Sequence, residues 1–221
     1  MTQRDRPAGD PTLAYAYLHG FASSPLAKKG THLRDALAPA VELVLPDLNR
    51  PSFAKLSVGA MLEALDAMHE AQGRPRWRLV GSSLGGWLAA RWAELHPARV
   101  DRLVLLCPAF DIPARWPHLL PPGAFDAWQA RGELEMHDAT GALVPLHFGF
   151  YEEARGHTPY PRVTCPVTIV HGTRDDRVPL ESSRRWLRDH PHARLVEVDD
   201  GHDLVASLPV IEGEIRSTFE L

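Results

Sequence analysis

The chain has 221 residues, of which 44% are hydrophobic and 24% charged, and its formal net charge is −4. This length suits one domain with a sizeable core, and the composition is ordinary for a soluble globular protein. The small negative charge and the lack of a basic stripe or an RNA-type aromatic motif argue against a nucleic-acid partner.

Targeting signals, disulfides and metal sites are not expected. Residues 1–11 are polar, without the apolar core of a secretory signal, and no apolar run approaches the roughly 18 residues that span a bilayer. We therefore expect a cytoplasmic protein without a membrane span. The two cysteines, Cys107 and Cys165, each stand beside a proline and are interpreted as buried thiols. The 12 histidines are scattered without ligand spacing, so the sequence predicts neither a metal nor an organic cofactor.

Strands and helices are expected to alternate along the chain. In chain order, the predicted strands cover residues 13–18, 41–45, 77–80, 102–106, 167–171 and 194–198. The predicted helices cover residues 26–38, 58–71, 84–95 and 180–188, with a last helix inside residues 203–220. Ser24 with Pro25 indicates the start of the first helix, Ser57 caps the second, and Pro209 marks a break or a late start in the last.

The predicted strands are short, apolar on consecutive residues and rich in Val and Leu, as strands buried on both faces are. Their alternation with helices predicts an α/β fold with a doubly wound, mostly parallel, six-stranded sheet flanked by helices. We expect residues 1–221 to form a single domain.

One segment interrupts this alternation. Roughly 60 residues separate the strand that ends at residue 106 from the one that starts at residue 167, too many for a simple crossover. They are rich in aromatic residues, proline and glycine. The segment is either an extra helix that pads the sheet or a small cap insertion at approximately residues 109–165. We favour the cap because ligands of open α/β sheets bind at the carboxyl ends of the strands, where this segment leaves the sheet.

The sequence Gly81-Ser82-Ser83-Leu84-Gly85 joins a predicted strand to a predicted helix. Gly-x-Ser-x-Gly in this setting is the nucleophile-elbow pattern, in which a strained turn exposes the serine hydroxyl. The two glycines are needed because a Cβ at either place would collide with the neighbouring strand or helix. The alternative is an ordinary turn with a serine as helix N-cap. As a nucleophile, Ser83 would lie at the positive end of the helix dipole.

Serine becomes a nucleophile when a base takes its proton, and that base needs an orienting acid. In an elbow enzyme the chain order is Ser, then Asp or Glu, then His. The loop after residues 167–171 contains Asp175 and Asp176, and either could orient an imidazole. The loop after the last strand contains His202. A histidine there is by itself often only a surface residue, but the three residues in this order predict a catalytic triad.

The oxyanion of the reaction needs two backbone N–H donors. We expect one from Leu84, which follows the nucleophile, and one from Phe21 in the loop after the first strand. His19-Gly20 allows a tight turn that directs the Phe21 N–H inward. His19 is interpreted as a brace of this turn without a chemical role.

With these motifs in order, the chain resembles the α/β-hydrolase superfamily over almost its whole length. The motifs are His19-Gly20-Phe21 with Ser23-Ser24-Pro25, Gly81 to Gly86, His171-Gly172-Thr173-Arg174-Asp175-Asp176-Arg177-Val178-Pro179, and Gly201-His202. Leu-His-Gly-Phe-x-Ser-Ser-Pro resembles the small bacterial YqiA-like esterases, and the cap and the aspartate loop are similar to those of mitochondrial acyl-protein thioesterases. The resemblance implies that Asp175 is the triad acid. The fold's usual first two antiparallel strands have no room before Leu13, which implies a trimmed core.

The expected function is that of a serine hydrolase that cleaves carboxylic esters of short to medium acyl chain through a Ser-His-Asp triad and an acyl-enzyme intermediate. An acyl-thioesterase is the alternative, because the attacked carbonyl is the same. A peptidase and a non-catalytic binding protein on the same fold are further alternatives. The expected partner is a small-molecule acyl ester or thioester, and the oligomeric state stays open.

Overall fold

The computed structural model describes residues 12–221; the polar stretch 1–11, on which the expectation of no secretory signal rests, lies outside the described residues. The main sheet has six strands in the order β2-β1-β3-β4-β7-β8, and each neighbouring pair is parallel. This confirms the expected doubly wound, parallel six-stranded sheet. The strands are β1 (Leu13–Leu18), β2 (Leu43–Val44), β3 (Arg76–Ser82), β4 (Val100–Leu106), β7 (Val167–Gly172) and β8 (Ala193–Val198).

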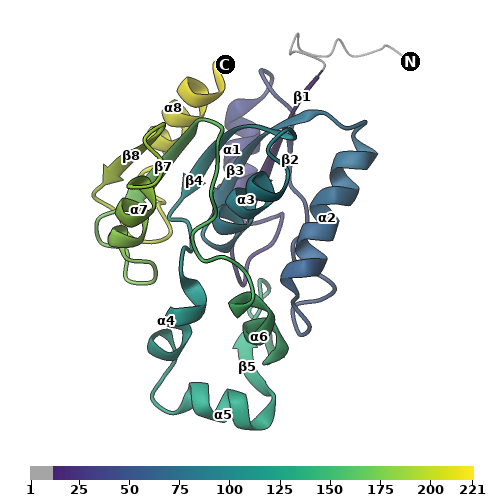
Figure 1. Ribbon diagram of the computed structural model, residues 1–221, viewed down its shortest axis with the longest axis vertical. Helices are drawn as coiled ribbons and strands as arrows, with labels where there is room; N and C mark the ends of the chain where they lie inside the picture. The colour runs from purple at the N-terminus through teal and green to yellow at the C-terminus, as the bar shows by residue number, and fades with distance from the viewer. Residues whose placement is uncertain (1–11) are drawn as a thin grey trace.

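Helices cover both faces of this sheet (Figure 1). Those flanking the sheet are α1 (Lys28–Leu37), α2 (Val58–Ala71), α3 (Leu84–Leu95), α7 (Leu180–Leu187) and α8 (Leu208–Phe219). Residues of α1 and α8 share one buried hydrophobic cluster, and residues of α2, α3 and α7 share the other. The last helix starts late, with Pro209 in its first turn, where its missing N–H costs no hydrogen bond.

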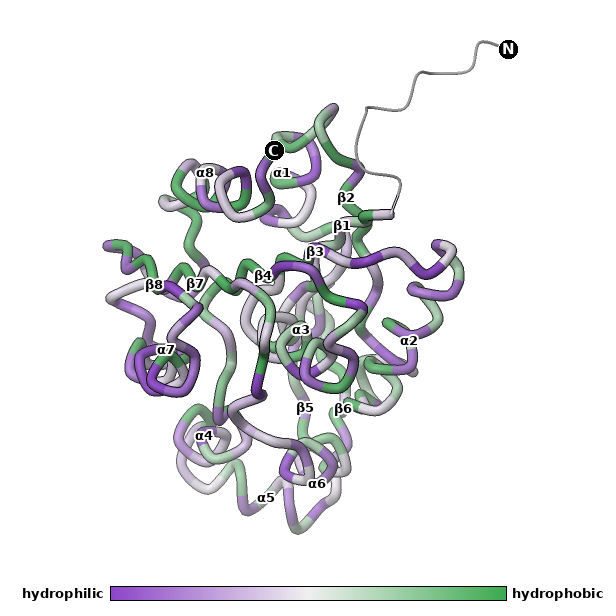
Figure 2. Tube along the Cα trace, turned by 45° about the horizontal axis from the view of Figure 1, so that its top comes forward, coloured by the Kyte–Doolittle hydropathy of each residue, from purple (hydrophilic) through white to green (hydrophobic). Residues whose placement is uncertain are grey.

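The central strands are buried on both faces, as their continuous apolar sequences predict. In β3, the neighbouring residues Leu79 and Val80 are both fully buried but belong to opposite clusters, because successive side chains of a strand point to opposite faces. Figure 2 shows the sheet strands between the helices on its two sides. Burial on both sides fixes the positions of the strand ends, where the loops begin.

Two predicted boundaries are wrong near the start of the chain. The first helix begins at Lys28 with Ala27 as N-cap, not at Ser24-Pro25, because the Ser24 carbonyl accepts the Ala27 N–H in a separate turn. The second strand is only Leu43–Val44, because this edge strand pairs with β1 at two positions alone. Ser57, by contrast, caps α2 as predicted: its side chain accepts a hydrogen bond from the Ala60 N–H at 3.1 Å.

The segment between β4 and β7 forms a small layer of its own beyond the carboxyl ends of the strands (Figure 1). Its elements are α4 (Ile112–Leu119), α5 (Ala124–Arg131), β5 (Glu133–His137), β6 (Leu143–His147) and α6 (Gly149–Arg155). We call residues 109–165 the insertion. The alternative of one padding helix is wrong, and the antiparallel β5–β6 pair was not expected. Glu153 of α6 joins the insertion to the core, since its carboxylate accepts hydrogen bonds from the Val58 and Gly59 N–H groups at 3.0 and 2.7 Å.

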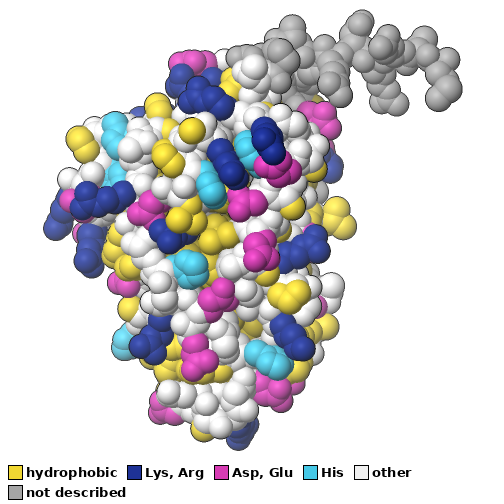
Figure 3. Space-filling model, turned by 45° about the vertical axis from the view of Figure 1, so that its right-hand side comes forward, with side chains coloured by type: hydrophobic (Ala, Val, Ile, Leu, Met, Phe, Trp, Pro, Cys, Tyr) yellow, Lys and Arg dark blue, Asp and Glu magenta, His cyan; other side chains and the backbone are white. Residues whose placement is uncertain are grey.

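The face of the molecule seen in Figure 3 carries acidic and basic side chains intermixed, with apolar side chains between them. It presents no extended basic tract of the kind that binds a polyanion. None of the helices in residues 12–221 has the length and apolar character needed to cross a membrane.

Candidate active site

Ser83 lies in the sharp turn between β3 and α3. Its backbone has φ 53° and ψ −118°, a left-handed conformation that is strained for a residue with a side chain. A Cβ on Gly81 would lie 2.4 Å from the Gly85 carbonyl oxygen, and one on Gly85 would lie 2.2 Å from that of Leu18. Both contacts are with backbone that cannot move aside, so the steric reason for the two glycines is confirmed.

The structure brings Ser83, His202 and Asp175 together from three separate loops. Ser83 Oγ lies 3.0 Å from His202 Nε2, and His202 Nδ1 lies 2.7 Å from Asp175 Oδ2. A carboxylate only accepts, so Nδ1–H donates to Asp175 and Nε2 is free to accept the Ser83 hydroxyl proton. Asp176, the other candidate acid, is exposed, and the carboxylate that faces the imidazole is that of Asp175.

Asp175 is held from several sides. Its Oδ1 accepts hydrogen bonds from the Arg177 and Val178 N–H groups at 2.9 and 2.8 Å. Its Oδ2 faces both His202 and His171, and the side chain is fully buried. Burial alone would raise the pKa of this carboxyl, but hydrogen bonds from His171 and His202 hold its pKa well below the usual range. Asp175 is therefore ionised whenever the fold is intact near neutral pH.

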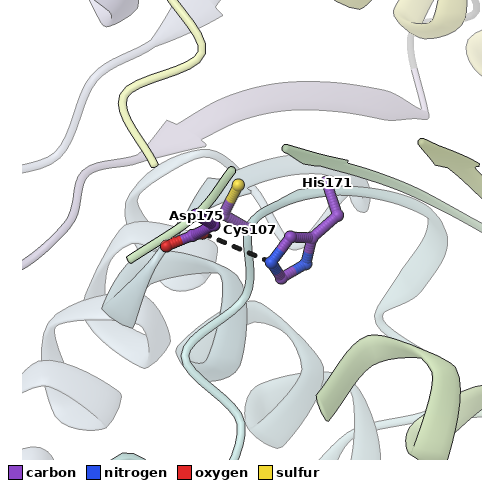
Figure 4. Close-up of side chains that lie close together, drawn as sticks. All are labelled: Cys107, His171 and Asp175. Atoms are coloured by element: carbon purple, nitrogen blue, oxygen red, sulfur yellow. Dashed lines mark ion pairs between the residues drawn. The ribbon is translucent and has the colours of Figure 1, made fainter. Parts of the chain in front are cut away.

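Cys107 and His171 lie beside Asp175 (Figure 4), and the three ligand-type atoms are within 4.8 Å of one another. Each nitrogen of His171 already has a protein partner: Nε2–H donates to the Val178 carbonyl at 2.9 Å, and Nδ1 accepts from the Ser183 hydroxyl at 2.8 Å. Burial raises the pKa of the Cys107 thiol, and the nearby Asp175 charge adds to this. A metal would need a thiolate and a free ring nitrogen, whereas the Cys107 thiol is protonated and both His171 nitrogens are hydrogen-bonded. The cluster instead supports the carboxylate.

The second cysteine differs from the expectation of a fully buried thiol. Cys165, in the segment that leads back to β7, is partly buried, and this burial raises the pKa of its thiol to about 12. Both cysteines are free, and neither has the lowered pKa of a reactive nucleophile.

Phe21 and Leu84 border the same cavity as Ser83. Within residues 12–221, neither backbone N–H donates to a protein acceptor. Gly20 lets this loop approach the serine, since a Cβ there would lie 3.2 Å from Ser83 Cβ. His19 is buried, and its Nε2 accepts from the Leu48 N–H at 3.0 Å while its Nδ1–H donates to the Gly20 carbonyl at 2.9 Å. Both ring nitrogens are thus used to brace the turn.

The Phe21 ring connects this loop to the insertion. Its centroid lies 5.3 Å from that of Trp116 in an edge-on contact and 6.1 Å from that of Phe150 in a stacked one. It also contacts Phe53 from the core side at 5.4 Å. Phe21, which lines the cavity, is therefore held in place by aromatic residues of the insertion.

The cavity around Ser83 has a volume of about 450 Å³, within the range of small-molecule sites. The insertion supplies an apolar wall that includes Ile112, Trp116, Leu119 and Phe150. The lining also includes the polar side chains of Tyr17 from β1, Lys29 from α1 and Ser82 from the end of β3, which we call the polar wall. The site thus offers both apolar surface and hydrogen-bonding groups around Ser83.

Three residues of this site were not assigned a role from the sequence. The sequence shows His171 only as part of the aspartate-loop motif and Cys107 only as a buried thiol, and it does not single out Lys29. The adjacency of His171 to the aspartate loop was an available signal. No pattern in the sequence relates Lys29 to Ser82, because they are 53 positions apart and meet only across the sheet edge.

The model of an uncharacterised protein family, UPF0227, matches residues 14–212. Among curated proteins, the chain is 31% identical to the mitochondrial palmitoyl-protein thioesterase ABHD10 of Rattus norvegicus, over 59% of this chain and 50% of that protein. It is 30% identical to the pimeloyl-[acyl-carrier protein] methyl ester esterase of Chromobacterium violaceum, over 54% of this chain and 60% of that protein. The matched region therefore spans only about half of these relatives.

The fold is also that of a solved structure, the α/β-hydrolase domain-containing protein 10 from mouse. The TM-score is 0.77 at 20% identity, covering 100% of this chain and 97% of that one. This confirms the resemblance to the α/β-hydrolase fold. The similarity extends over the six-stranded sheet and the insertion alike, since it covers 100% of this chain.

Proposed function

The chain belongs to the uncharacterised protein family UPF0227, and from the geometry of its Ser83 site we propose that it is a serine hydrolase that cleaves carboxylic esters. The observation that carries the proposal is the relay of hydrogen bonds from Ser83 Oγ to His202 at 3.0 Å and from His202 to Asp175 at 2.7 Å. These distances lie within the range that a nucleophile and its base require.

In the proposed reaction, His202 Nε2 takes the Ser83 hydroxyl proton while Oγ attacks the acyl carbonyl carbon. The Phe21 and Leu84 N–H groups stabilise the oxyanion that forms, and Asp175 stabilises the imidazolium. His202 then gives its proton to the departing alcohol, leaving an acyl group on Ser83. Water, deprotonated by His202, attacks this acyl-enzyme and releases the carboxylic acid.

The apolar wall of the insertion favours an acyl group of short to medium length. A second candidate is an acyl-thioesterase, because the similar ABHD10 protein of Rattus norvegicus is a palmitoyl-protein thioesterase. The chemistry at Ser83 would be the same, with a thiol in place of the alcohol as leaving group. A series of p-nitrophenyl esters and matched acyl-thioesters separates the two: turnover of thioesters without turnover of esters would favour the thioesterase.

The direct test is labelling with a fluorophosphonate, which reacts only with an activated serine. We expect the folded protein to be labelled at Ser83 and the Ser83→Ala variant not to be labelled. Ser82→Ala is a useful control because its hydroxyl is adjacent in sequence but faces Lys29. A folded sample that fails to react, or that reacts equally after Ser83→Ala, would refute the proposal.

A further inference from the structure

Lys29 and Arg177 are the two cations that line the Ser83 cavity, and Arg177 lies 3.9 Å from Asp203 of the same lining, whereas Lys29 has no such ion pair within residues 12–221. Lys29 lies in the first turn of α1 and is partly buried, with its Nζ donating a hydrogen bond to Ser82 Oγ at 3.2 Å. An ammonium group has three N–H donors, so two of them have no partner among residues 12–221. Ser82 immediately precedes the nucleophile, so the ammonium stands next to the turn that holds Ser83.

This ammonium has no counter-ion in the described part of the chain, since no carboxylate there lies within 4.0 Å of it. The carboxylates that act on it electrostatically have other partners: Asp175 contacts His202, Asp203 lies 3.9 Å from Arg177, and Asp200 accepts from Ser207 at 2.9 Å. Burial lowers the pKa of Lys29, and Cys107 and these carboxylates oppose the shift without removing it. The charged form has therefore lost water and gained a hydrogen bond to Ser82 but no counter-ion at contact distance.

We propose that Lys29 binds a carboxylate carried by the substrate, so that the preferred substrates of this hydrolase are esters or thioesters of acidic compounds. This inference rests on the proposed hydrolase function. A carboxylate in the cavity would supply the missing counter-charge and accept the two unused donors, while the apolar part of the same molecule contacts the insertion. The cavity thus suits a molecule that is apolar at one end and negatively charged at the other.

A structural role for Lys29 is the competing explanation. In that case its purpose would be to hold Ser82 in place. The two explanations differ in what they predict for substrate charge. A merely structural lysine would affect charged and neutral substrates alike, whereas a lysine that binds the substrate carboxylate would affect the charged substrate more.

The test compares esters that differ only in charge. In one pair the carboxylate or carboxamide is on the acyl side: the phenyl monoester of adipic acid, and the same ester with its free carboxylate replaced by a carboxamide. In the other pair the carboxylate or carboxamide is on the leaving group: 4-carboxyphenyl butyrate and 4-carbamoylphenyl butyrate. The values of kcat/KM are measured for the wild type, for Lys29→Met and for Lys29→Arg. Lys28→Met is the matched control, because Lys28 is the preceding residue of the same helix and is exposed outside the cavity.

We expect the wild type to prefer the carboxylate over the carboxamide in one of the two pairs. In Lys29→Met this ratio should fall by about tenfold or more, the size of one lost charge-assisted hydrogen bond, whereas Lys29→Arg keeps part of it and Lys28→Met keeps all of it. The pair that responds identifies which end of the substrate faces α1.

Equal kcat/KM for acid and amide in both wild-type pairs, or equal losses for both in Lys29→Met, would overturn the inference while leaving the hydrolase function intact. The wild-type comparison decides this even if the variant does not fold. If none of the four esters is cleaved and a fluorophosphonate does not label Ser83, the proposed function fails, and this inference fails with it.

Discussion

His171 Nε2 lies 3.3 Å from Asp175 Oδ2, the same oxygen that accepts the 2.7 Å hydrogen bond from His202. The other carboxylate oxygen, Oδ1, accepts hydrogen bonds from two backbone N–H groups. The acid of the proposed triad is thus fixed by the β7 strand end and its own loop, independently of whether His202 is protonated. This explains how a carboxylate can stay charged in a fully buried position.

Replacing this acid should therefore remove most of the activity. An asparagine at position 175 can reverse the hydrogen bond to His202 and stabilise the wrong tautomer, which in other triads costs about 10⁴ in rate. We expect Asp175→Asn to lower kcat/KM on p-nitrophenyl butyrate by about 10³ or more. Asp176→Asn, one residue further in the same loop and exposed, should stay within about twofold of the wild type. A larger loss in Asp176→Asn than in Asp175→Asn would contradict the assignment.

The same carboxylate should make the stability depend on pH. In the folded protein the pKa of Asp175 is below the ordinary 3.8, so the unfolded chain binds a proton more readily than the folded one. The stabilisation is then fully present above about pH 5 and is lost as the pH falls below about 4, with a slope of up to about 1.4 kcal/mol per pH unit.

Urea unfolding between pH 3 and pH 6 checks this. The difference in unfolding free energy between the wild type and Asp175→Asn should shrink as the pH falls, whereas Asp176→Asn should follow the wild type. A difference that stays constant across this range would mean that the folded pKa of Asp175 is not lowered.

Phe21 is expected to couple the insertion to the reaction. Phe21→Ala leaves the backbone N–H in the chain but removes the ring that Trp116 and Phe150 hold, so the donor loses its fixed position. We expect kcat to fall by about tenfold to a hundredfold, less than the loss of a whole oxyanion donor, with a smaller change in KM. Phe125→Ala is the control, since Phe125 packs against Trp128 and Tyr151 of the same insertion but makes no ring contact with Phe21. Equal effects on kcat in the two variants would indicate a general loss of insertion packing.

The main sheet and the positions of Ser83, Asp175 and His202 could be predicted because they depend on local rules. The central strands, buried on both faces, are continuous apolar segments, and each of these three residues stands in a glycine-containing segment within four residues of the end of a strand. The secondary structure of the insertion is harder to predict. Pro145 in β6 argues against a strand in the sequence, yet it is accommodated opposite Glu135 because a two-stranded sheet consists only of edges.

The contacts of Lys29 and His171 could not be predicted for a different reason. Each depends on which way a side chain points across a gap between two elements, and a one-residue shift would direct it elsewhere. The helix α1 begins at Lys28, two residues later than its predicted start at residue 26, and Lys29 in its first turn reaches Ser82. An error of this size is unimportant for the fold but decides which residues enter the cavity.

The glycines of the elbow and a glycine elsewhere should respond in opposite directions to the same substitution. In Gly81→Ala, the new methyl would lie 2.4 Å from the Gly85 carbonyl oxygen, and the backbone of the turn would have to shift. We expect the unfolding free energy to fall by more than about 3 kcal/mol. Most of the activity should also be lost, because the shift moves Ser83 away from His202.

In Gly213→Ala, nothing lies within 4 Å of the new methyl, and the residue is inside α8 and exposed. There alanine should stabilise the helix by up to about 1 kcal/mol and raise Tm by about 2–4 °C, with no change in kcat/KM. Thermal unfolding and ester turnover are measured for both variants, which separates the steric clash at the elbow from the general effect of replacing a glycine. Similar Tm values for the two variants would show that the turn tolerates a side chain.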